Sequence, residues 1–334
     1  MAYCRKKMLD FLTNLYYHRF MNIQQILDNR QCFKLVCGAG NEDVEQVRRL
    51  VFVYALAGAN IFDLSANEDV ILAAQDSLKR ADRDAALCVS VGIAGDPHVS
   101  KAVIDTDKCI SCGACHSVCP QNAIDDKTVN HHKCIGCHKC EKVCHNCAIT
   151  FVSRTKPVSD ILSPLCKYPI SVYELHAIGE NEVAVDNDWA AVCEMPSLMK
   201  SLCIDRSKVG NERLIARIRR CLDGRQPQTT IIQTDGTPMS GGKDDFRTTL
   251  QAIATAELVT KYQIPAYILL SGGTNSHSAE LAAMCGVPIN GVAIGSFARQ
   301  IVADFIADPH FWERPDLIGM AVTRAKMLVR NITG

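Results

Sequence analysis

Two runs of four cysteines are the feature that most limits what this chain can fold into. The first run is Cys109, Cys112, Cys115 and Cys119, and the second is Cys134, Cys137, Cys140 and Cys144. Both have the spacing C-x2-C-x2-C-x3-C. Closely spaced thiolates on a short loop suit an iron–sulfur cubane, because three sulfurs can reach three corners of one cluster. Such a segment has little apolar core of its own, so we expect it to depend on its clusters for stability.

The spacing also predicts which cysteines share a cluster. The fourth cysteine of each run is expected to begin a helical turn that points away, so that it ligates the other cluster. We therefore expect one [4Fe–4S] cluster on Cys109, Cys112, Cys115 and Cys144, and a second on Cys134, Cys137, Cys140 and Cys119. Zinc is the alternative, but zinc sites commonly combine two separated CxxC pairs, which this repeated run of four does not resemble.

The second run departs from the usual two-cluster pattern after its last cysteine. His145 stands where Pro120 follows the first run, and Cys147 is an extra thiol. Proline stiffens the chain at such a point, so its loss should loosen this end. Cys147 is either a spare ligand, a redox-active thiol or a small residue in a helical turn. Five histidines of this segment are expected to be solvated surface groups that make the cluster potentials depend on pH: His116, His131, His132, His138 and His145.

Composition indicates where such a chain would work. It has 334 residues, and 36 basic residues balance 36 acidic ones, which argues against nucleic acid as the main partner. The amino-terminal sequence has no uninterrupted apolar stretch of the kind found in signal peptides. The most apolar run, residues 51–62, is too short and too interrupted to span a bilayer. We therefore expect a cytoplasmic protein with no integral membrane segment, whose clustered cysteines bind metal.

Outside the cysteine-rich segment, short apolar strands alternate with helices. Strands are expected at 33–37, 61–64, 87–91, 170–175, 198–204, 230–234, 267–270 and 292–294, and helices at 8–27, 67–79 and 211–222, with another that Asn41 caps. Uniformly apolar strands between helices predict a parallel sheet buried on both faces. About eight such units predict an α/β fold, namely a (β/α)8 TIM-like barrel, with a doubly wound open sheet as the alternative.

The alternation is interrupted once, after the third expected strand. We expect a leading helix in 1–30, the first part of the barrel with strands 1–3 in 31–98, an inserted ferredoxin-like 2[4Fe–4S] domain in 99–155 and the second part with strands 4–8 in 156–334. The insert would therefore leave the barrel beside its mouth, at the carboxyl ends of the strands.

The expected strand ends carry polar residues, and in barrels of this kind active sites lie at that end. These residues are Lys34, Cys37, Asp63, Ser65, Ser90, Glu174, His176, Asp205, Arg206, Gln233, Thr234 and Asp235. Glycine-rich ends on the last two strands predict a phosphate site, although the glycines could simply make tight turns. Its candidate residues are Gly272, Gly273, Thr274, Gly295, Ser296 and Arg299. Asp235 and Glu174 are expected on the opposite rim, and residues 235–242 form a candidate lid.

Three stretches of the chain resemble the light-dependent period (LdpA) family of cyanobacteria. They are FKLVCGAG at 33–40, the two cysteine runs, and IIQTDGTPMSG with SGGTNSHS at 231–241 and 271–278. The cysteine-rich segment also resembles bacterial two-cluster ferredoxins, and several barrel stretches are similar to a barrel family encoded in algal plastids. The resemblance implies an iron–sulfur protein that senses cellular redox state and modulates the circadian clock, with clock-input proteins as partners.

Two functions fit these features. In the first, the protein is a redox sensor or electron relay whose clusters change oxidation state and whose barrel passes that change to a redox partner protein or a clock-input protein. In the second, it is an oxidoreductase: the barrel binds a phosphorylated small molecule, FMN or another phosphate-bearing ligand, and the clusters supply electrons from across the mouth. No nucleophile–base motif stands out, and aromatic residues make up only 6% of the chain, so no stacking surface for a flavin is evident.

Overall fold

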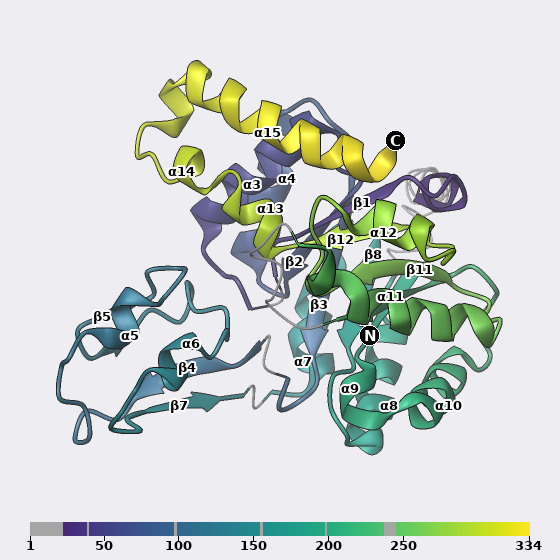
Figure 1. Cartoon of the computed structure of the whole chain (residues 1–334), viewed down its shortest axis with the longest axis horizontal. Helices are drawn as coiled ribbons and strands as arrows, with labels where there is room; N and C mark the ends of the chain where they lie inside the picture. Colours follow the sequence, from purple (N-terminus) through teal and green to yellow (C-terminus); the bar gives the residue numbers. More distant parts are fainter. Residues whose placement is uncertain (1–22, 39, 97–98, 154–155, 198, 237–244) are drawn as a thin grey trace.

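The computed structural model of the chain contains a closed barrel of parallel strands (Figure 1). It describes residues 23–38, 40–96, 99–153, 156–197, 199–236 and 245–334. The barrel strands are β1 (Cys32–Val36), β2 (Ile61–Ser65), β3 (Ala86–Gly92), β8 (Val172–His176), β9 (Met199–Ile204), β10 (Thr230–Asp235), β11 (Tyr267–Ser271) and β12 (Gly291–Ile294). β1 pairs with both β2 and β12, which closes the ring. The predicted barrel is confirmed, and the open-sheet alternative is wrong.

Helices between the strands cover the outside of the barrel (Figure 1). The longer ones are α3 (Val44–Ala57), α4 (Glu68–Arg80), α8 (Glu182–Cys193), α10 (Asn211–Leu222), α11 (Phe246–Lys261) and α15 (Pro315–Thr333). The shorter ones are α7 (Val158–Leu162), η2 (Ser163–Lys167), α9 (Arg206–Val209), α12 (Ser278–Met284), α13 (Ser296–Gln300), α14 (Ala303–Ile306) and η3 (Phe311–Glu313). α10 has the bounds that its apolar periodicity predicts.

One predicted helix cap is wrong. The cap of α3 is Asp43, whose carboxylate accepts from the N–H of Gln46 at 3.1 Å, and not Asn41. Asn41 is instead buried and donates from its amide to the side chain of Gln46 at 2.9 Å. Both residues are good caps, and the sequence alone does not say at which of them the helix begins.

The amino-terminal end of the barrel is closed by an apolar cluster. Ile23 and Leu27 pack there against strand residues such as Cys32, Ile61 and Met199. Residues 23–28 are helical, and the remainder of the predicted leading helix lies outside the described residues. Since this apolar cluster fills the amino-terminal end, the carboxyl ends of the strands are where we look for a ligand site.

A small cysteine-rich segment lies between β3 and β8 in the chain and beside the barrel in space (Figure 1). It contains two short antiparallel sheets, β4 (Lys101–Ile104) with β7 (Ile149–Val152) and β5 (Ile124–Asp125) with β6 (Thr128–Val129), and two helical turns, α5 (Ala114–Ser117) and α6 (Lys139–Lys142). The buried residues of its core are Ala102, Ile104, Ala123, Ile124, Cys134, Cys140 and Ile149, and four further cysteines pack against them together with Val129 and Phe151. Because two of the buried residues are cysteines of the second run, the segment depends on them for its packing.

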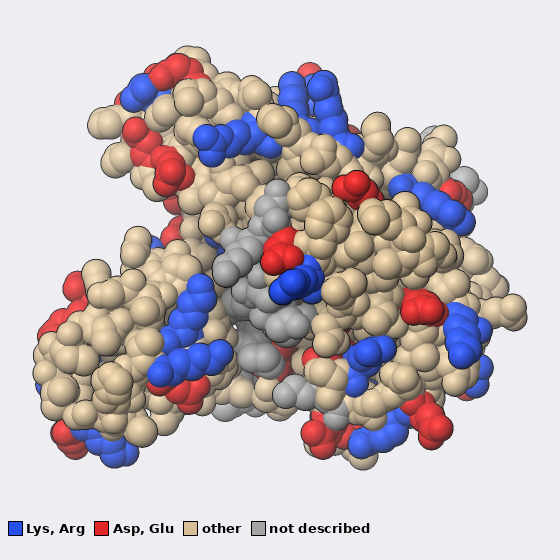
Figure 2. All heavy atoms as spheres, in the orientation of Figure 1, with Lys and Arg blue, Asp and Glu red and all other residues tan. Residues whose placement is uncertain are grey.

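The surface is of mixed charge. On the face shown in Figure 2, basic and acidic side chains are interspersed over both the barrel and the cysteine-rich segment. Within the described part of the chain, each helix is too short or too polar to cross a membrane.

Candidate functional site: two cysteine cavities and the barrel mouth

The structure gathers the eight predicted ligands around two cavities. The first cysteine cavity is lined by Cys109, Cys112, Cys115 and Cys144. The second cysteine cavity is lined by Cys119, Cys134, Cys137 and Cys140. In each cavity three cysteines come from one run and the fourth from the other run, which is the grouping that the spacing predicts.

The two cavities have matching backbone geometry. The N–H of Ala123 points to the sulfur of Cys119 at 3.3 Å, and the N–H of Ala148 points to the sulfur of Cys144 at 3.3 Å. Left-handed residues also recur at corresponding positions of the runs: Ser111 and Gly136, Gly113 and His138, Asn122 and Cys147. Such turns aim backbone N–H groups at the thiolates, as an iron–sulfur cluster requires. The residues present therefore fit two cubane clusters.

Two details of the sequence prediction need correction. The fourth cysteine of each run does not begin a helical turn, because α5 ends at Ser117 and α6 at Lys142, each before that cysteine. The turn contains the third cysteine instead, and the chain reverses after it. Cys147 is not packed in a helical turn either. It is exposed at a left-handed turn with φ of +49°, and it lines neither cysteine cavity.

Two histidines of the segment line the cysteine cavities. The ring of His138 stacks on Phe151 with centroids 3.7 Å apart and lines the second cysteine cavity. His132 fits the prediction, since its side chain is 71% exposed near Glu42. His145 lines the first cysteine cavity.

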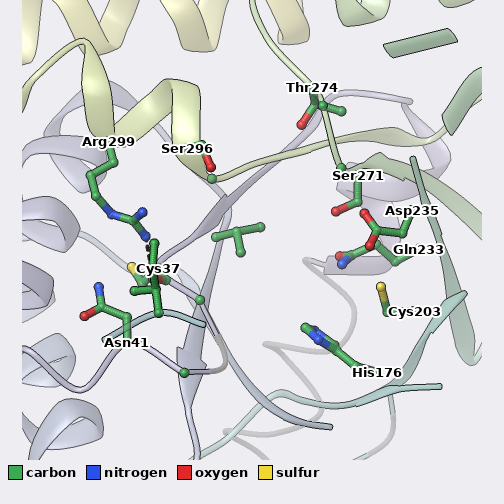
Figure 3. A pocket seen from close by; sticks show the side chains of 17 residues that line it. Cys37, Asn41, His176, Cys203, Gln233, Asp235, Ser271, Thr274, Ser296 and Arg299 are labelled. Carbon is green, nitrogen blue, oxygen red and sulfur yellow. Dashed lines mark hydrogen bonds between the residues drawn. The ribbon is translucent and has the colours of Figure 1, made fainter. Parts of the chain in front are cut away.

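A further cavity opens at the carboxyl ends of the barrel strands (Figure 3). All six residues of the predicted phosphate site line this mouth cavity: Gly272, Gly273, Thr274, Gly295, Ser296 and Arg299. Cys37, His176, Cys203, Gln233 and Asp235 line it as well. Ile135, which follows Cys134 in the second run, lies on the same cavity. The mouth cavity and the second cysteine cavity thus share a wall.

The loop after β11 lines this cavity with residues whose backbone N–H groups form no hydrogen bond to other described residues. Gly272 and Gly273 both have left-handed backbone, with φ of +64° and +76°, and a Cβ at Gly272 would collide with the carboxylate of Asp235. The carbonyl of Gly273 accepts from the hydroxyls of Thr248 and Thr249. No hydrogen bond within the described chain uses the N–H of Gly272, Gly273 or Thr274. These groups are available to an anion.

Arg299 supplies positive charge on the other side of the mouth cavity (Figure 3). Its Nη2 donates to the carbonyl of Cys37 at 2.7 Å, while its Nε is buried without a hydrogen-bond partner among the described residues. Burial lowers the pKa of Arg299, and the electrostatic effect of Cys37 offsets this desolvation only in part. A half-buried guanidinium that has no carboxylate partner among the described residues favours an anionic ligand.

The expected rim of carboxylates is not found. Glu174 does not line the mouth cavity but lies fully buried below it. Asp235 does line the cavity, but it lies against Gly272 on the glycine side and not opposite it. Asp205 caps α9 by accepting from the N–H of Ser207 at 2.7 Å, and neither it nor Arg206 lines the cavity. Residues 237–242 of the predicted lid at 235–242 lie outside the described residues.

A layer of charged and polar side chains fills the barrel below the mouth. Lys34 donates to Glu174 at 2.6 Å and to Gln233 at 2.8 Å, and its ammonium lies 3.5 Å from Asp63. His176 lies 3.1 Å from Glu174 and 3.4 Å from Asp96. Barrel layers are usually filled by Val, Ile and Leu. Since His176 and Gln233 also line the cavity, this network reaches from its floor into the interior.

The side chains of this network determine one another's protonation states. Burial opposes ionisation of Glu174, but Lys34 and His176 outweigh it and lower the pKa of that carboxyl to about 2. Burial raises the pKa of Asp63 to about 6, although Lys34 partly offsets this effect. Burial disfavours the charged forms of Lys34 and His176, yet the neighbouring carboxylates raise the pKa of both groups well above their usual values. Lys34 is thus a fixed internal cation.

The same residues could suggest a metal site. Ligand atoms of Asp63, Glu174 and His176 all lie within 4.8 Å of one another. However, the ammonium of Lys34 already bridges the two carboxylates. A metal ion would have to displace it, so we assign this group as an ion-pair network.

The cysteine-rich segment contacts the barrel at the loop after β1. The N–H of Glu42 donates to the carbonyl of His132 at 2.9 Å, and Gln46 donates to Gln121 at 2.9 Å. The segment therefore reaches the mouth cavity next to Arg299 and Cys37, not from across it. Sequence reasoning missed Ile135 in this wall, because an isoleucine in a cysteine loop gives no sign of what it contacts.

Comparisons with known proteins agree with the class that this fold and site define: a barrel protein with a 4Fe–4S binding segment. The family model for the 4Fe-4S binding domain matches residues 102–125. Among solved structures, the YdjI aldolase of Escherichia coli K12 has a TM-score of 0.52 at 9% identity, covering 92% of this chain and 96% of its own. Tryptophan synthase subunit alpha of Legionella pneumophila has a TM-score of 0.51 at 8% identity, covering 94% and 97%. At such low identity these likenesses show the fold alone.

The family is given by two further matches. The model of the Light dependent period A C-terminal domain matches residues 165–331. Light dependent period A of Synechococcus elongatus is 30% identical over 319 residues, which cover 89% of this chain and 90% of the relative. The chain belongs to the Light dependent period A family.

Proposed function

We propose that this protein is an electron relay or redox sensor with two [4Fe–4S] clusters, coupled to a ligand site in the mouth of its barrel. The observation that carries the proposal is that Ile135, inside the second cysteine run, lines the mouth cavity. A cluster held by Cys119, Cys134, Cys137 and Cys140 would then be the one next to the barrel. The first cysteine cavity would be the outer one, where a redox partner could exchange electrons.

Each bound cluster would supply one-electron redox chemistry. The chain's own residues hold the sulfurs in place, aim backbone N–H groups at them and keep the inner cluster against the barrel. The outer site is the more open of the two, since Cys112 is exposed whereas Cys134 and Cys140 are buried. This difference favours electron entry from a partner at the outer cluster. The family's name suggests a link to light-dependent timing. In this proposal the partner at the outer cluster is therefore a redox partner protein or a cytoplasmic clock-input protein.

A second function is favoured by the mouth cavity itself. The N–H groups of Gly272 and Gly273 and the Nε of Arg299, which have no hydrogen-bond partner in the described part of the chain, favour a phosphate-bearing ligand that the inner cluster could reduce. The described lining includes no Phe, Tyr or Trp, so a small phosphate ester suits the cavity better than FMN. His176 and Gln233 would then contact the reactive part of that ligand from below.

Metal analysis and a redox titration of protein purified without oxygen test the first proposal. Two clusters require about eight iron and eight sulfide per chain and two one-electron steps. About four iron, or zinc in place of iron, would contradict it. Spectra after cluster removal address the second function, since remaining flavin bands would indicate FMN. Structures with FMN and with inorganic phosphate should show density between Gly272 and Arg299, and an empty site under both conditions would leave the relay alone.

A further inference from the structure

Lys101 lies between the second cysteine run and the loop that follows β1. Its ammonium donates to the carbonyl of Cys134 at 2.8 Å and to the carbonyl of Gly40. Cys134 is a proposed ligand of the inner cluster, and Gly40 lines the mouth cavity. The N–H of the next residue, Ala102, points to the sulfur of Cys134 at 3.5 Å. One side chain therefore joins the inner cluster site to the barrel mouth.

The contacts continue from Gly40 to Arg299. The N–H of Asn41 donates to the carbonyl of Gly38 at 3.0 Å, so the loop folds back on itself. Gly38 has φ of +106°, and a Cβ built on it would lie 3.9 Å from Nη2 of Arg299. That same nitrogen binds the carbonyl of Cys37. A displacement of Gly40 would therefore shift the guanidinium of Arg299, which faces the cavity.

The ammonium of Lys101 is placed to respond to cluster charge. Burial lowers the pKa of Lys101, while Glu42 and Cys134 act in the opposite direction. Partial burial also strengthens the attraction between this ammonium and any added negative charge nearby. The backbone bond from Glu42 to His132 and the amide bond from Gln46 to Gln121 are neutral, and the side-chain contact of His132 with Glu42 lies on an exposed imidazole, where solvent screens a charge change more than at Lys101.

We propose that Lys101 is a positioning residue that couples the charge of the inner cluster to the loop at Gly38 and Gly40, and through it to the anion site at Arg299. The inference rests on the proposed function. A one-electron donor protein reduces the cluster, whose charge falls by one, and no covalent bond forms or breaks. The ammonium of Lys101 then moves toward Cys134 and weakens its bond to Gly40. By linkage, an anion bound at Arg299 changes the potential of that cluster by the same free energy.

Amide hydrogen exchange of the intact holoprotein, oxidised and chemically reduced, tests this coupling without any added ligand. In the wild type, exchange at Gly38 and Gly40 should differ between the two states by at least about fivefold, the lower range of such couplings. Lys101→Met should remove the difference, and Lys101→Arg, which keeps a cation able to reach both carbonyls, should retain it. Lys108→Met is the matched control, because this exposed lysine pairs with Asp105 beside the outer run.

Three results would overturn the proposal: no difference in the wild type, an undiminished difference in Lys101→Met, or loss of the inner cluster's iron from that variant, which would make Lys101 part of the cluster site itself. Inorganic phosphate binding is measured separately by calorimetry. If phosphate does not bind, the proposed anion site and its linkage to the cluster potential are wrong. A redox-dependent exchange rate at Gly38 and Gly40 that Lys101→Met abolishes would still establish the coupling of the cluster to the loop.

Discussion

The ammonium of Lys34 lies 2.6 Å from Oε2 of Glu174 inside the barrel, and both side chains are almost completely excluded from solvent. Gln233 and Asp63 surround the same ammonium. An ion pair at this depth costs desolvation, and a protein tolerates it only when every partner is satisfied. The pair therefore makes the stability of the barrel depend on each of its members.

Replacing Lys34 with Met should destabilise the protein by about 3–5 kcal/mol, because the buried carboxylates of Glu174 and Asp63 would lose their shared ammonium and only Glu174 would keep His176 beside it. Adding Glu174→Gln to that variant should recover part of the loss, since the charge is then gone. Urea unfolding of the single and double variants measures both effects. Lys167→Met removes an exposed pair with Glu68 and should barely move the midpoint. An unchanged midpoint in Lys34→Met would refute the argument.

Asp63 should make stability depend on pH. Its pKa is raised to about 6, above the value of about 3.9 for an unfolded chain, so the folded state holds this proton more tightly. The resulting stabilisation is present below about pH 4 and is lost as the pH rises through 6. Asp63→Asn cannot titrate, so its stability relative to the wild type should rise by up to about 3 kcal/mol between pH 4 and 7. Urea unfolding across this range checks the sign, and a flat or falling difference would contradict it.

Exchanging single cysteines should reveal the crossed ligation. Cys119→Ser should lose the cluster on Cys134, Cys137 and Cys140, and iron should fall from about eight to about four per chain. Hydrogen exchange identifies which cluster is lost: protection should fall at residues 132–141 and persist at 109–116. Cys144→Ser should give the reverse pattern, and Cys147→Ser should keep both clusters. Loss of protection within the variant's own run would show that the ligation is not crossed.

The barrel and the grouping of cysteines were predictable because both follow from local pattern. Apolar strands between helices specify the sheet, and the spacing of each run specifies which sulfurs can meet. The network below the mouth was not predictable in this way. Lys34 and Glu174 each stand within apolar strands, and their depth depends on strand stagger in the closed barrel, which a single strand does not encode. For that reason Glu174 was expected at the rim and lies instead in the interior.

The contacts between the cysteine-rich segment and the barrel could not be predicted from the sequence either. Lys101 joins Gly40 to Cys134 across 61 and 33 positions of the chain. A lysine at the start of a short strand is ordinarily a solvated residue. Only the docking of the segment on the loop after β1 gives it two carbonyl partners, and no local pattern specifies that docking.

Arg299 should determine whether the mouth cavity holds an anion. Its Nε is buried without a hydrogen-bond partner among the residues that the structure describes, and its Nη2 is fixed by the carbonyl of Cys37, so the guanidinium is positioned before any ligand arrives. A charge-assisted hydrogen bond contributes about 1.5–3 kcal/mol, so Arg299→Met should weaken the binding of inorganic phosphate by about ten- to a hundredfold. Calorimetry on the holoprotein measures this affinity.

The phosphate affinity of Arg299→Lys should lie between those of the wild type and Arg299→Met, because a lysine keeps the charge but not the fixed geometry. Arg324→Met, on the exposed side of α15, is the matched control and should bind as the wild type does. Equal affinity in the wild type and Arg299→Met would place any bound phosphate elsewhere and leave the glycine loops as simple turns.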